Sequence, residues 1–345
     1  MWSPSNRSNA NSLKLIPVII VLCGLLFWLL GRPAPVQWSR WAGAPQQAEA
    51  IVGAARPVAP VVANSAPLEQ YHMESALQDA TPDGSVRFFR RAVAGGTLDY
   101  FVVKLDKNVH VEVLNADGAT PGSDASGDTV WADGKQHLAT VAAMTRAPYA
   151  ARDGMELLGA MAFGFHGART SDEGTVVING MIKRVNPWRA ALCLTKDGAA
   201  KIGLFDAAAL QQCQQAIGGG PVILLDGKIA NPDAQAATDE FVPFNPLNEN
   251  FVQLDWRKKI YTGTYPKTAV GIGKDAQGGA FLVLATSYGI SGVELARQLK
   301  AMGCTDALGG DDDTSTQAVW RGQPTQSRVV QPVPDAIGVW WKRGN

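Results

Sequence analysis

Three carboxylates and three hydroxyl side chains stand next to one another near the C-terminal end of this chain. After two glycines, the segment 309–316 carries Asp311, Asp312, Asp313, Thr314, Ser315 and Thr316. Carboxylates can transfer protons or stabilise positive charge during bond cleavage, and hydroxyls can hydrogen-bond a polar ligand. A hydrophobic core has no use for such a composition, so it indicates a candidate site. The alternative interpretation is a solvated acidic turn.

A second polar group follows residues 155–163, a run that is typical of a buried strand. His166, Arg169 and Glu173 lie in the glycine-flanked segment that comes next. Glycine lets a ligand approach the backbone closely, and arginine can bind a phosphate through two parallel hydrogen bonds. These residues are therefore candidates for ligand binding, with Glu173 as a second carboxylate. An ordinary polar loop would have a similar composition.

Three consecutive glycines, Gly218, Gly219 and Gly220, precede a proline and a strand-like run. A nucleotide-binding P-loop would need a following helix and a Lys-Ser or Lys-Thr pair, and this segment has neither. The backbone N–H groups of such a run can hydrogen-bond a phosphate or sugar oxygen. The glycines thus predict a ligand-binding loop or a structural turn. Residues 231–257 are long and polar, and we expect an insertion or a lid over the site.

Hydrophobic period and turn residues predict the strands and helices around these positions. Strands are expected at residues 86–93, 97–104, 109–114, 155–163, 189–195, 200–205, 268–272, 280–285 and 317–320. Helices are expected at residues 136–147, at 207–215 after an Asp206 cap, and from a Ser291 and Glu294 capping box to a stop at Gly303. Residues 309–316 would then form a loop between two elements, where functional sites are commonly assembled.

The composition limits the fold class and the partners. The chain has 345 residues, of which 46% are hydrophobic, so it can bury a sizeable core. The pattern of elements predicts an α+β domain with a mixed β-sheet core and flanking helices. Lysine plus arginine and aspartate plus glutamate number 31 each, and no long basic run occurs. This balance argues against nucleic acid as a main partner.

Cysteine spacing gives no sign of a metal site. The four cysteines are Cys23, Cys193, Cys213 and Cys304. Because they lack a C-x-x-C spacing, zinc is not expected. We expect the last three to be buried free thiols, with a Cys193–Cys213 disulfide as the alternative in an oxidising compartment. No cofactor is predicted; a divalent cation at Asp312 and Asp313 is the alternative, although the triplet lacks the spacing of a calcium-binding loop.

The N-terminal region predicts export. Residues 15–30 contain no charge, and the positive residues in the tail 1–14 favour a cytoplasmic N-terminus. No small-x-small cleavage site follows closely, so we interpret residues 15–31 as a single transmembrane helix in the inner (cytoplasmic) membrane. A cleaved signal peptide is the alternative. Residues 32–67, rich in Ala and Pro, predict an extended linker, and residues 68–345 a globular domain in the periplasm or outside the cell.

The order and the residue sequences of these segments resemble those of the phosphodiester glycosidase family. Members carry an R-T-A-x-G strand, a helix and then A-x-N-L-D-G-G-G-S-[SA]-T, where this chain has Lys267-Thr-Ala-Val-Gly271 and Ala307-Leu-Gly-Gly-Asp-Asp-Asp-Thr-Ser-Thr316. The family also has a G-G-P segment similar to residues 218–228. The resemblance implies hydrolysis of a sugar-1-phosphodiester between the anomeric carbon and the phosphate oxygen, on a carbohydrate or sugar-phosphate of envelope or exopolysaccharide metabolism.

The resemblance also implies roles for the candidate residues. Asp311 takes the place of the family's aspartate and is expected to be the central catalytic carboxylate, assisted by Asp312 and with Glu173 as the second carboxylate. Lys267 and Arg169 are expected to bind the phosphate. The other substrate-binding candidates are His166, Gly218, Gly219, Gly220, Thr314, Ser315 and Thr316.

Several expected site positions depart from the family pattern. Lys267 replaces an arginine, and Asp312 and Asp313 replace two glycines. Thr286 and Ser287 replace an Asp-Gly pair. A metal-dependent site is one hypothesis, and these changes leave two others. The first is a hydrolase with a divergent substrate, and the second is a non-catalytic descendant that binds a glycan or a partner in exopolysaccharide assembly.

Overall fold

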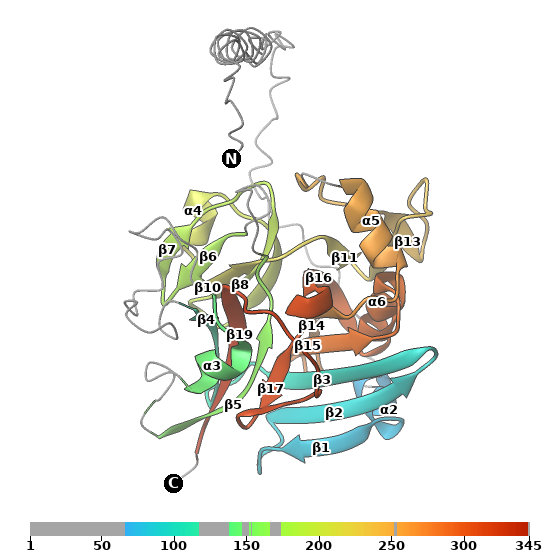
Figure 1. Ribbon diagram of the computed structural model, residues 1–345. Coiled ribbons are helices and arrows are strands. Elements are labelled where there is room, and N and C mark those ends of the chain that lie inside the picture. Colours follow the sequence, from blue (N-terminus) through green and yellow to red (C-terminus); the bar gives the residue numbers. More distant parts are fainter. Residues whose placement is uncertain are drawn as a thin grey trace, which may run out of the picture. The chain divides into compact units, whose positions relative to one another are not determined.

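The computed structural model describes residues 66–116, 138–146, 152, 154–165, 174–251 and 254–343, all within one compact unit, Val62–Asn345. In these residues the fold is sheet-rich α+β, with three β-sheets and short helices (Figure 1). The predicted mixed α+β domain is confirmed at this level. No helix of this described part is long and apolar enough to cross a membrane. The predicted anchor, residues 15–31, lies outside it and stays a prediction.

A nine-stranded sheet forms the centre of the described fold. Its order is β1 (Ala76–Ala80), β2 (Val86–Val93), β3 (Gly96–Lys104), β15 (Ala280–Tyr288), β14 (Lys267–Lys274), β16 (Cys304–Asp312), β11 (Val222–Leu225), β12 (Lys228–Asn231) and β13 (Phe241–Pro243). Only the β12–β13 pair of this sheet is parallel. The strand that carries the first two aspartates, β16, therefore lies between two neighbours well inside the sheet.

Two five-stranded sheets complete the β structure of the described residues. One has the order β7 (Met181–Arg184), β6 (Val176–Ile178), β10 (Cys213–Gly218), β8 (Ala190–Thr195) and β9 (Ala200–Leu204). The other has the order β18 (Gln323–Pro324), β17 (Ala318–Trp320), β5 (Met155–Ala162), β19 (Asp335–Lys342) and β4 (Val109–Asn115). The helices are α2 (Ala66–Met73), α3 (Val141–Arg146), α4 (Ala207–Leu210), α5 (Leu254–Thr262), α6 (Gly292–Ala301) and the 3-10 turn η3 (Asp313–Ser315).

The nine-stranded sheet is buried on both faces. Leu308 of β16 belongs to an apolar cluster that includes Ile217 of β10, from one of the smaller sheets. Ala307, the residue before it, belongs to a second cluster with Leu299 of α6. Figure 1 shows α5 and α6 together on the side of β14 and β16, where α6 contacts both strands. Because a fully buried leucine contributes about 1.5–3 kcal/mol, this two-sided packing fixes β16 firmly.

The elements before the acidic segment follow the prediction. β14 and β15 form the predicted antiparallel hairpin, with Lys267 opposite Ser287. Ser291 caps α6, because its Oγ accepts a hydrogen bond from the backbone N of Glu294 at 3.1 Å. Gly303 follows the helix with φ +88°, a left-handed conformation that favours glycine at a helix end.

The predicted loop at residues 309–316 is wrong in its first half, because β16 runs on to Asp312. The two glycines of this half are needed for close packing rather than for a turn. A Cβ on Gly309 would lie 1.5 Å from the hydroxyl oxygen of Tyr261, and one on Gly310 would lie 2.4 Å from Oγ1 of Thr268. Glycine usually marks turns or bulges, so the sequence pattern predicted a loop where the structure has a buried strand.

Two further expectations are corrected around β10. The helix predicted at residues 207–215 ends at Leu210, although Asp206 caps it as expected, and β10 begins at Cys213. Cys213 forms a disulfide with Cys193 of β8, so these cysteines are not free thiols; Cys304 is buried and free. Pairing with β8 overrides the helical pattern, because it gives β10 a ladder and a covalent link. The helix predicted at 136–147 is also shorter, spanning Val141–Arg146 among the described residues.

Removal of the disulfide is expected to lower the free energy of unfolding. The bond joins residues 20 apart in sequence, so the Cys193→Ala, Cys213→Ala double variant should lose about 3 kcal/mol. Denaturant unfolding followed by tryptophan fluorescence measures this loss. Cys304→Ala is the control for removal of a sulfur atom. Equal unfolding midpoints for the wild-type protein with and without reductant would contradict the assignment.

Gly309→Ala is expected to disrupt the packing of β16 against α5. The new Cβ would overlap the Tyr261 hydroxyl, and overpacking of a core costs about 1–3 kcal/mol. Gly203→Ala is the matched control, because the nearest atom to its Cβ would be 3.8 Å away. Adding Tyr261→Phe should restore part of the lost stability. Equal thermal midpoints for the Gly309 and Gly203 variants would show that this contact is not needed.

Candidate active site

The two buried aspartates stand at a break in the pairing of β16 with β14. Asp312 pairs with Lys267 and Gly309 with Ala269, so three residue steps on β16 face two on β14. Such a β-bulge changes the direction of the side chains beside it. The backbone here is held on both sides: Asp311 N donates to Phe163 O at 2.8 Å, and the Thr268 hydroxyl donates to Asp311 O at 2.7 Å. The bulge therefore fixes two adjacent carboxylates, each only 8% exposed.

Asp312 is the carboxyl group with the most unusual environment at this bulge. Burial raises the pKa of Asp312 to about 7, and the neighbouring charge of Asp311 adds to the effect. Arg257 of α5 opposes it, with Nη1 3.7 Å from Oδ2 of Asp312. A carboxyl group with a pKa near neutrality can both hold and release a proton, as a general acid or base must.

Arg257 lies beside Asp312, and it shares the Phe165 ring with a second arginine, Arg189. The guanidinium carbon of Arg257 is 4.0 Å from the centroid of the Phe165 ring, and that of Arg189 is 5.4 Å from the same ring. Arg189 also stacks on Phe251 at 4.1 Å. Guanidinium groups beside aromatic faces are weakly hydrated and well oriented, and they match the geometry of phosphate. The arrangement thus combines buried carboxylates with cations that suit an anionic ligand.

The glycine run joins one of the smaller sheets to β16. Its amides are occupied: Gly218 N donates to Thr175 O at 2.7 Å, Gly219 N to Ala190 O at 3.0 Å and Gly220 N to Gly309 O at 2.8 Å. All three N–H groups therefore have backbone partners, and a substrate-binding role for these glycines stays a prediction. Their lack of side chains also matters, because a Cβ on Gly219 would lie 2.4 Å from Gly309 O.

Glu249 supports the glycine run from below the surface. Its carboxylate accepts hydrogen bonds from Ala190 N at 2.9 Å and Val222 N at 2.8 Å, and its Oε2 lies 3.8 Å from Nε of Arg189. Arg189 in turn donates to Gly219 O at 2.8 Å. Burial is the main cause that raises the pKa of Glu249. The region predicted as an insertion or lid therefore contributes buried side chains to the site itself.

Lys267 has a different environment from the one expected of a phosphate ligand. Its ammonium group donates to the carbonyls of Gly263 at 2.8 Å, Tyr265 at 2.6 Å and Ile290 at 3.4 Å. An ammonium has three donors, so all are used within the protein. Burial lowers the pKa of Lys267 to about 8, against the opposing effect of Asp312. In this structure Lys267 anchors the start of β14 beside the aspartates.

The hydroxyls after the aspartates do not form one group. Asp313 and Thr314 are exposed on η3. Ser315 is buried, and its Oγ accepts a hydrogen bond from Nε2 of Gln331 at 2.5 Å. Thr316 is also buried, with no hydrogen bond to its hydroxyl. These residues, which were predicted to bind substrate together, thus differ in exposure and in hydrogen-bond partners.

Three predicted site residues, His166, Arg169 and Glu173, lie outside the described residues, and their roles stay predictions. The residues that flank them do reach the site. Phe165 lies beneath Arg257, and a Cβ on Gly174 would be 2.4 Å from the Cα of Gly218. Phe165 therefore lies near the aspartates, and Gly174 lies against the glycine run.

Sequence reasoning missed Arg189, Glu249 and Arg257. Only Arg189 had a usable signal, a charged residue directly before an apolar strand. Nothing in the local sequence of Glu249 or Arg257 distinguishes them from surface residues. Among the residues that the structure describes, no group of three or more His, Cys, Asp or Glu side chains could hold a metal ion.

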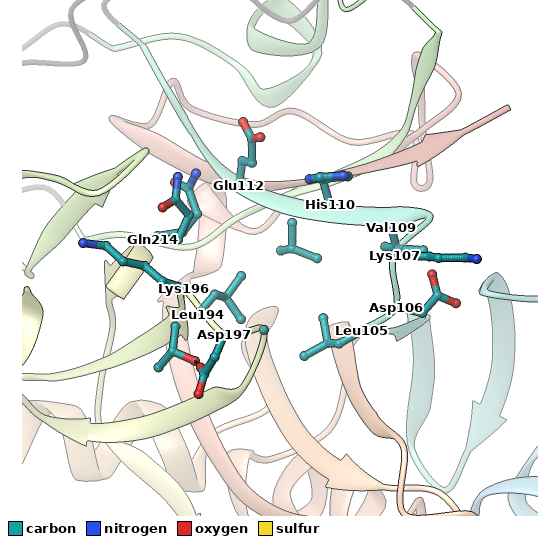
Figure 2. Close-up of a pocket in the computed structure, with 14 residues that line it drawn as sticks. Leu105, Asp106, Lys107, Val109, His110, Glu112, Leu194, Lys196, Asp197 and Gln214 are labelled. Carbon is teal, nitrogen blue, oxygen red and sulfur yellow. Dashed lines mark hydrogen bonds between the residues drawn. The ribbon is translucent and has the colours of Figure 1, made fainter. Parts of the chain in front are cut away.

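A separate cavity of about 500 Å³ lies between β4 and the turn after β8 (Figure 2). Figure 2 shows Leu105 and Leu194 on its opposite walls, with Lys107 and Lys196 at its two sides. None of the predicted site residues in the described ranges lines it. This cavity therefore does not belong to the aspartate site.

The candidate site therefore consists of two buried carboxylates with Arg257 beside them. A sequence model of the phosphodiester glycosidase family matches residues 156–340, and the chain belongs to this family. This confirms the resemblance inferred from the motifs. The match contains Arg189, Glu249, Arg257, Asp311 and Asp312.

Of two solved structures compared with this chain, the first has a similar fold. A hypothetical protein from Synechocystis is similar with a TM-score of 0.52 at 13% identity, over 74% of this chain; the chain spans 62% of that protein's length. The zebrafish N-acetylglucosamine-1-phosphodiester alpha-N-acetylglucosaminidase catalytic domain, auto-inhibited by its pro-peptide, has a TM-score of 0.48 at 16% identity, covering 79% of this chain and 82% of that one. No curated protein matches the chain.

Asp312→Asn is expected to flatten the pH dependence of stability. With a folded pKa of about 7 and an ordinary value of 3.8, the folded protein binds more protons than the unfolded chain between these values. The free energy of unfolding of the wild type therefore falls as the pH rises from about 4 to 7. In the variant, residue 312 cannot titrate, so this decrease in the free energy of unfolding is absent. Thermal unfolding at pH 8 should therefore show a variant at least as stable as the wild type.

Glu249→Gln is the contrasting variant. The substitution removes the carboxylate that pairs with the buried Arg189. It also places an amide NH₂ group beside backbone N–H donors that need an acceptor. Together these changes should lower the free energy of unfolding by about 3–5 kcal/mol. Glu240→Gln, on an exposed residue, should change little. A large destabilisation by Asp312→Asn at pH 8 would indicate that Asp312 is a structural residue like Glu249.

Proposed function

We propose that this chain hydrolyses a sugar-1-phosphodiester by cleaving the bond between the anomeric carbon and the phosphate oxygen. The observation that carries the proposal is the Asp312 carboxyl group, whose pKa is raised to about 7 beside Asp311 and Arg257. Membership of the phosphodiester glycosidase family supports the reaction class. The substrate would be a carbohydrate or sugar phosphate of envelope or exopolysaccharide metabolism.

The residues divide the chemical work as follows in this proposal. A water molecule attacks the anomeric carbon and gives its proton to Asp312, while the bond to the phosphate oxygen breaks and its electron pair leaves with the phosphate. Asp311 stabilises the positive charge that develops on the sugar. Phosphate leaves as an anion, so it needs cationic partners more than a proton, and Arg257 is the described arginine that lies beside Asp312.

We also propose that the enzyme acts outside the cytoplasm, anchored in the inner membrane by residues 15–31 with its globular domain in the periplasm or outside the cell. The uncharged run 15–30 supports this location. The Cys193–Cys213 disulfide supports it independently, because structural disulfides persist mainly in oxidising compartments.

Hydrolysis of a chromogenic sugar-1-phosphodiester tests the reaction. Asp312→Asn should lower kcat about 100-fold or more, as expected for loss of a general base. In the wild type, kcat/KM should rise as the pH increases through about 7, because the base must be deprotonated. Asp306→Asn is the control, since Asp306 is another half-buried carboxyl of β16 whose pKa burial raises. Full activity of Asp312→Asn would overturn this role.

A second candidate function is non-catalytic binding of a glycan or a partner in exopolysaccharide assembly. The observation that favours it is the complete use of the Lys267 donors by backbone carbonyls, where the family pattern has an arginine. Saturable binding of a sugar-1-phosphodiester without release of sugar, in wild type and Asp312→Asn alike, would support binding over hydrolysis.

A further inference from the structure

A cavity of about 350 Å³ lies at the same end of the nine-stranded sheet as the aspartates. Thr316, Tyr288, Arg328, Gln326, Ser327 and Val330 are among its lining residues. Lys267 connects the two places, because it pairs with Asp312 on β16 and with Ser287, the neighbour of Tyr288, on β15. Thr316 follows Asp312 by four residues across η3. A substrate held at Asp312 could therefore extend towards this cavity.

The cavity contains buried polar groups that the described protein does not satisfy. Thr316 has an exposed fraction of 0%, and its Oγ1 makes no hydrogen bond. Nη1 of Arg328 is likewise buried without a hydrogen-bond partner. A buried polar group left unpaired costs about 1–3 kcal/mol, so two of them lining one cavity need an explanation.

Arg328 also lacks a counter-charge in the described part of the chain. Its guanidinium carbon lies 5.5 Å from the centroid of the Tyr288 ring, and no described carboxylate forms an ion pair with it. Arg90 shows what a structural arginine looks like in the same region: it donates to Asp99 at 2.7 Å and 2.9 Å and to Thr325 O. The nearby Asp99 carboxylate is thus already paired, and the cavity keeps a net positive charge.

We propose that this cavity binds an anionic sugar unit of the substrate, with its carboxylate or phosphate ester on Arg328 and a sugar hydroxyl on Thr316. This assignment rests on the proposed hydrolase function and adds the class of substrate: a sugar-1-phosphodiester that carries a second, negatively charged sugar. Guanidinium binds carboxylate and phosphate through paired hydrogen bonds. The volume lies in the lower range of ligand pockets, which suits one sugar ring, and Val330 and Val319 offer apolar contact to its carbon face.

Direct binding to the full chain tests the proposal. Glucuronic acid, glucose 6-phosphate and neutral glucose are titrated by isothermal calorimetry or ligand-observed NMR. At least one of the anions should bind at least tenfold more tightly than glucose, and the tighter of the two identifies carboxylate or phosphate as the preferred group. Arg328→Gln should abolish the preference, whereas Arg343→Gln, on an exposed arginine, should keep it. Anions that bind no better than glucose, or an unchanged preference in Arg328→Gln, would overturn the proposal.

Thr316→Val provides a second variant that does not depend on a charge. Replacement of an unpaired buried hydroxyl by a methyl group should leave the thermal midpoint unchanged or raise it, yet weaken binding of the preferred anion several-fold. Equal affinity in Thr316→Val would contradict the role of this hydroxyl. Because binding is measured without turnover, a protein that binds these anions but hydrolyses no phosphodiester would contradict only the catalytic proposal.

Discussion

The close approach of glycine backbones is the constraint on which the rest of the structure depends. Gly220 N donates to Gly309 O at 2.8 Å and Gly309 N to Pro221 O at 3.0 Å, so the glycine run and β16 are joined in both directions. A side chain at Gly219 or Gly309 would meet backbone or the Tyr261 ring well inside van der Waals contact. The segment held in this way against β16 is the one that Arg189 and Glu249 contact, Arg189 through Gly219 O and Glu249 through Val222 N.

Burial then determines the chemistry of the site. In water an aspartate would be fully ionised at neutral pH, but Asp312 lies in a packed region where the charged form is poorly solvated. Arg257 and Lys267 offset this effect only in part, and the Lys267 ammonium group donates its hydrogen bonds to backbone carbonyls. A fold that keeps such a carboxyl group gives up stability at neutral pH, which is typical of functional residues rather than of scaffold residues.

Local signals in the sequence were sufficient for the hairpin β14–β15, the capped helix α6 and most of the strands. Each depends on neighbouring residues, such as the Ser291 cap and the Gly303 stop. The first half of the acidic segment could not be recognised as a strand, because glycines required by Tyr261 look like glycines of a turn. The pairing of Arg189 with Glu249 spans 60 residues of chain, and no local pattern could reveal it.

Two of the departures from the family pattern occur at residues that are cross-strand neighbours, so one physical cause can explain both. Lys267 and Asp312 are paired in register on adjacent strands, where the family pattern has an arginine and a glycine. Three carbonyls converging on one point suit the compact ammonium of lysine, whereas a planar guanidinium would leave several of its donors unpaired. With the positive charge drawn towards these carbonyls, the added carboxylate of Asp312 is compensated less completely. The two substitutions together thus place a carboxyl group that titrates near neutrality beside a lysine whose pKa burial lowers to about 8.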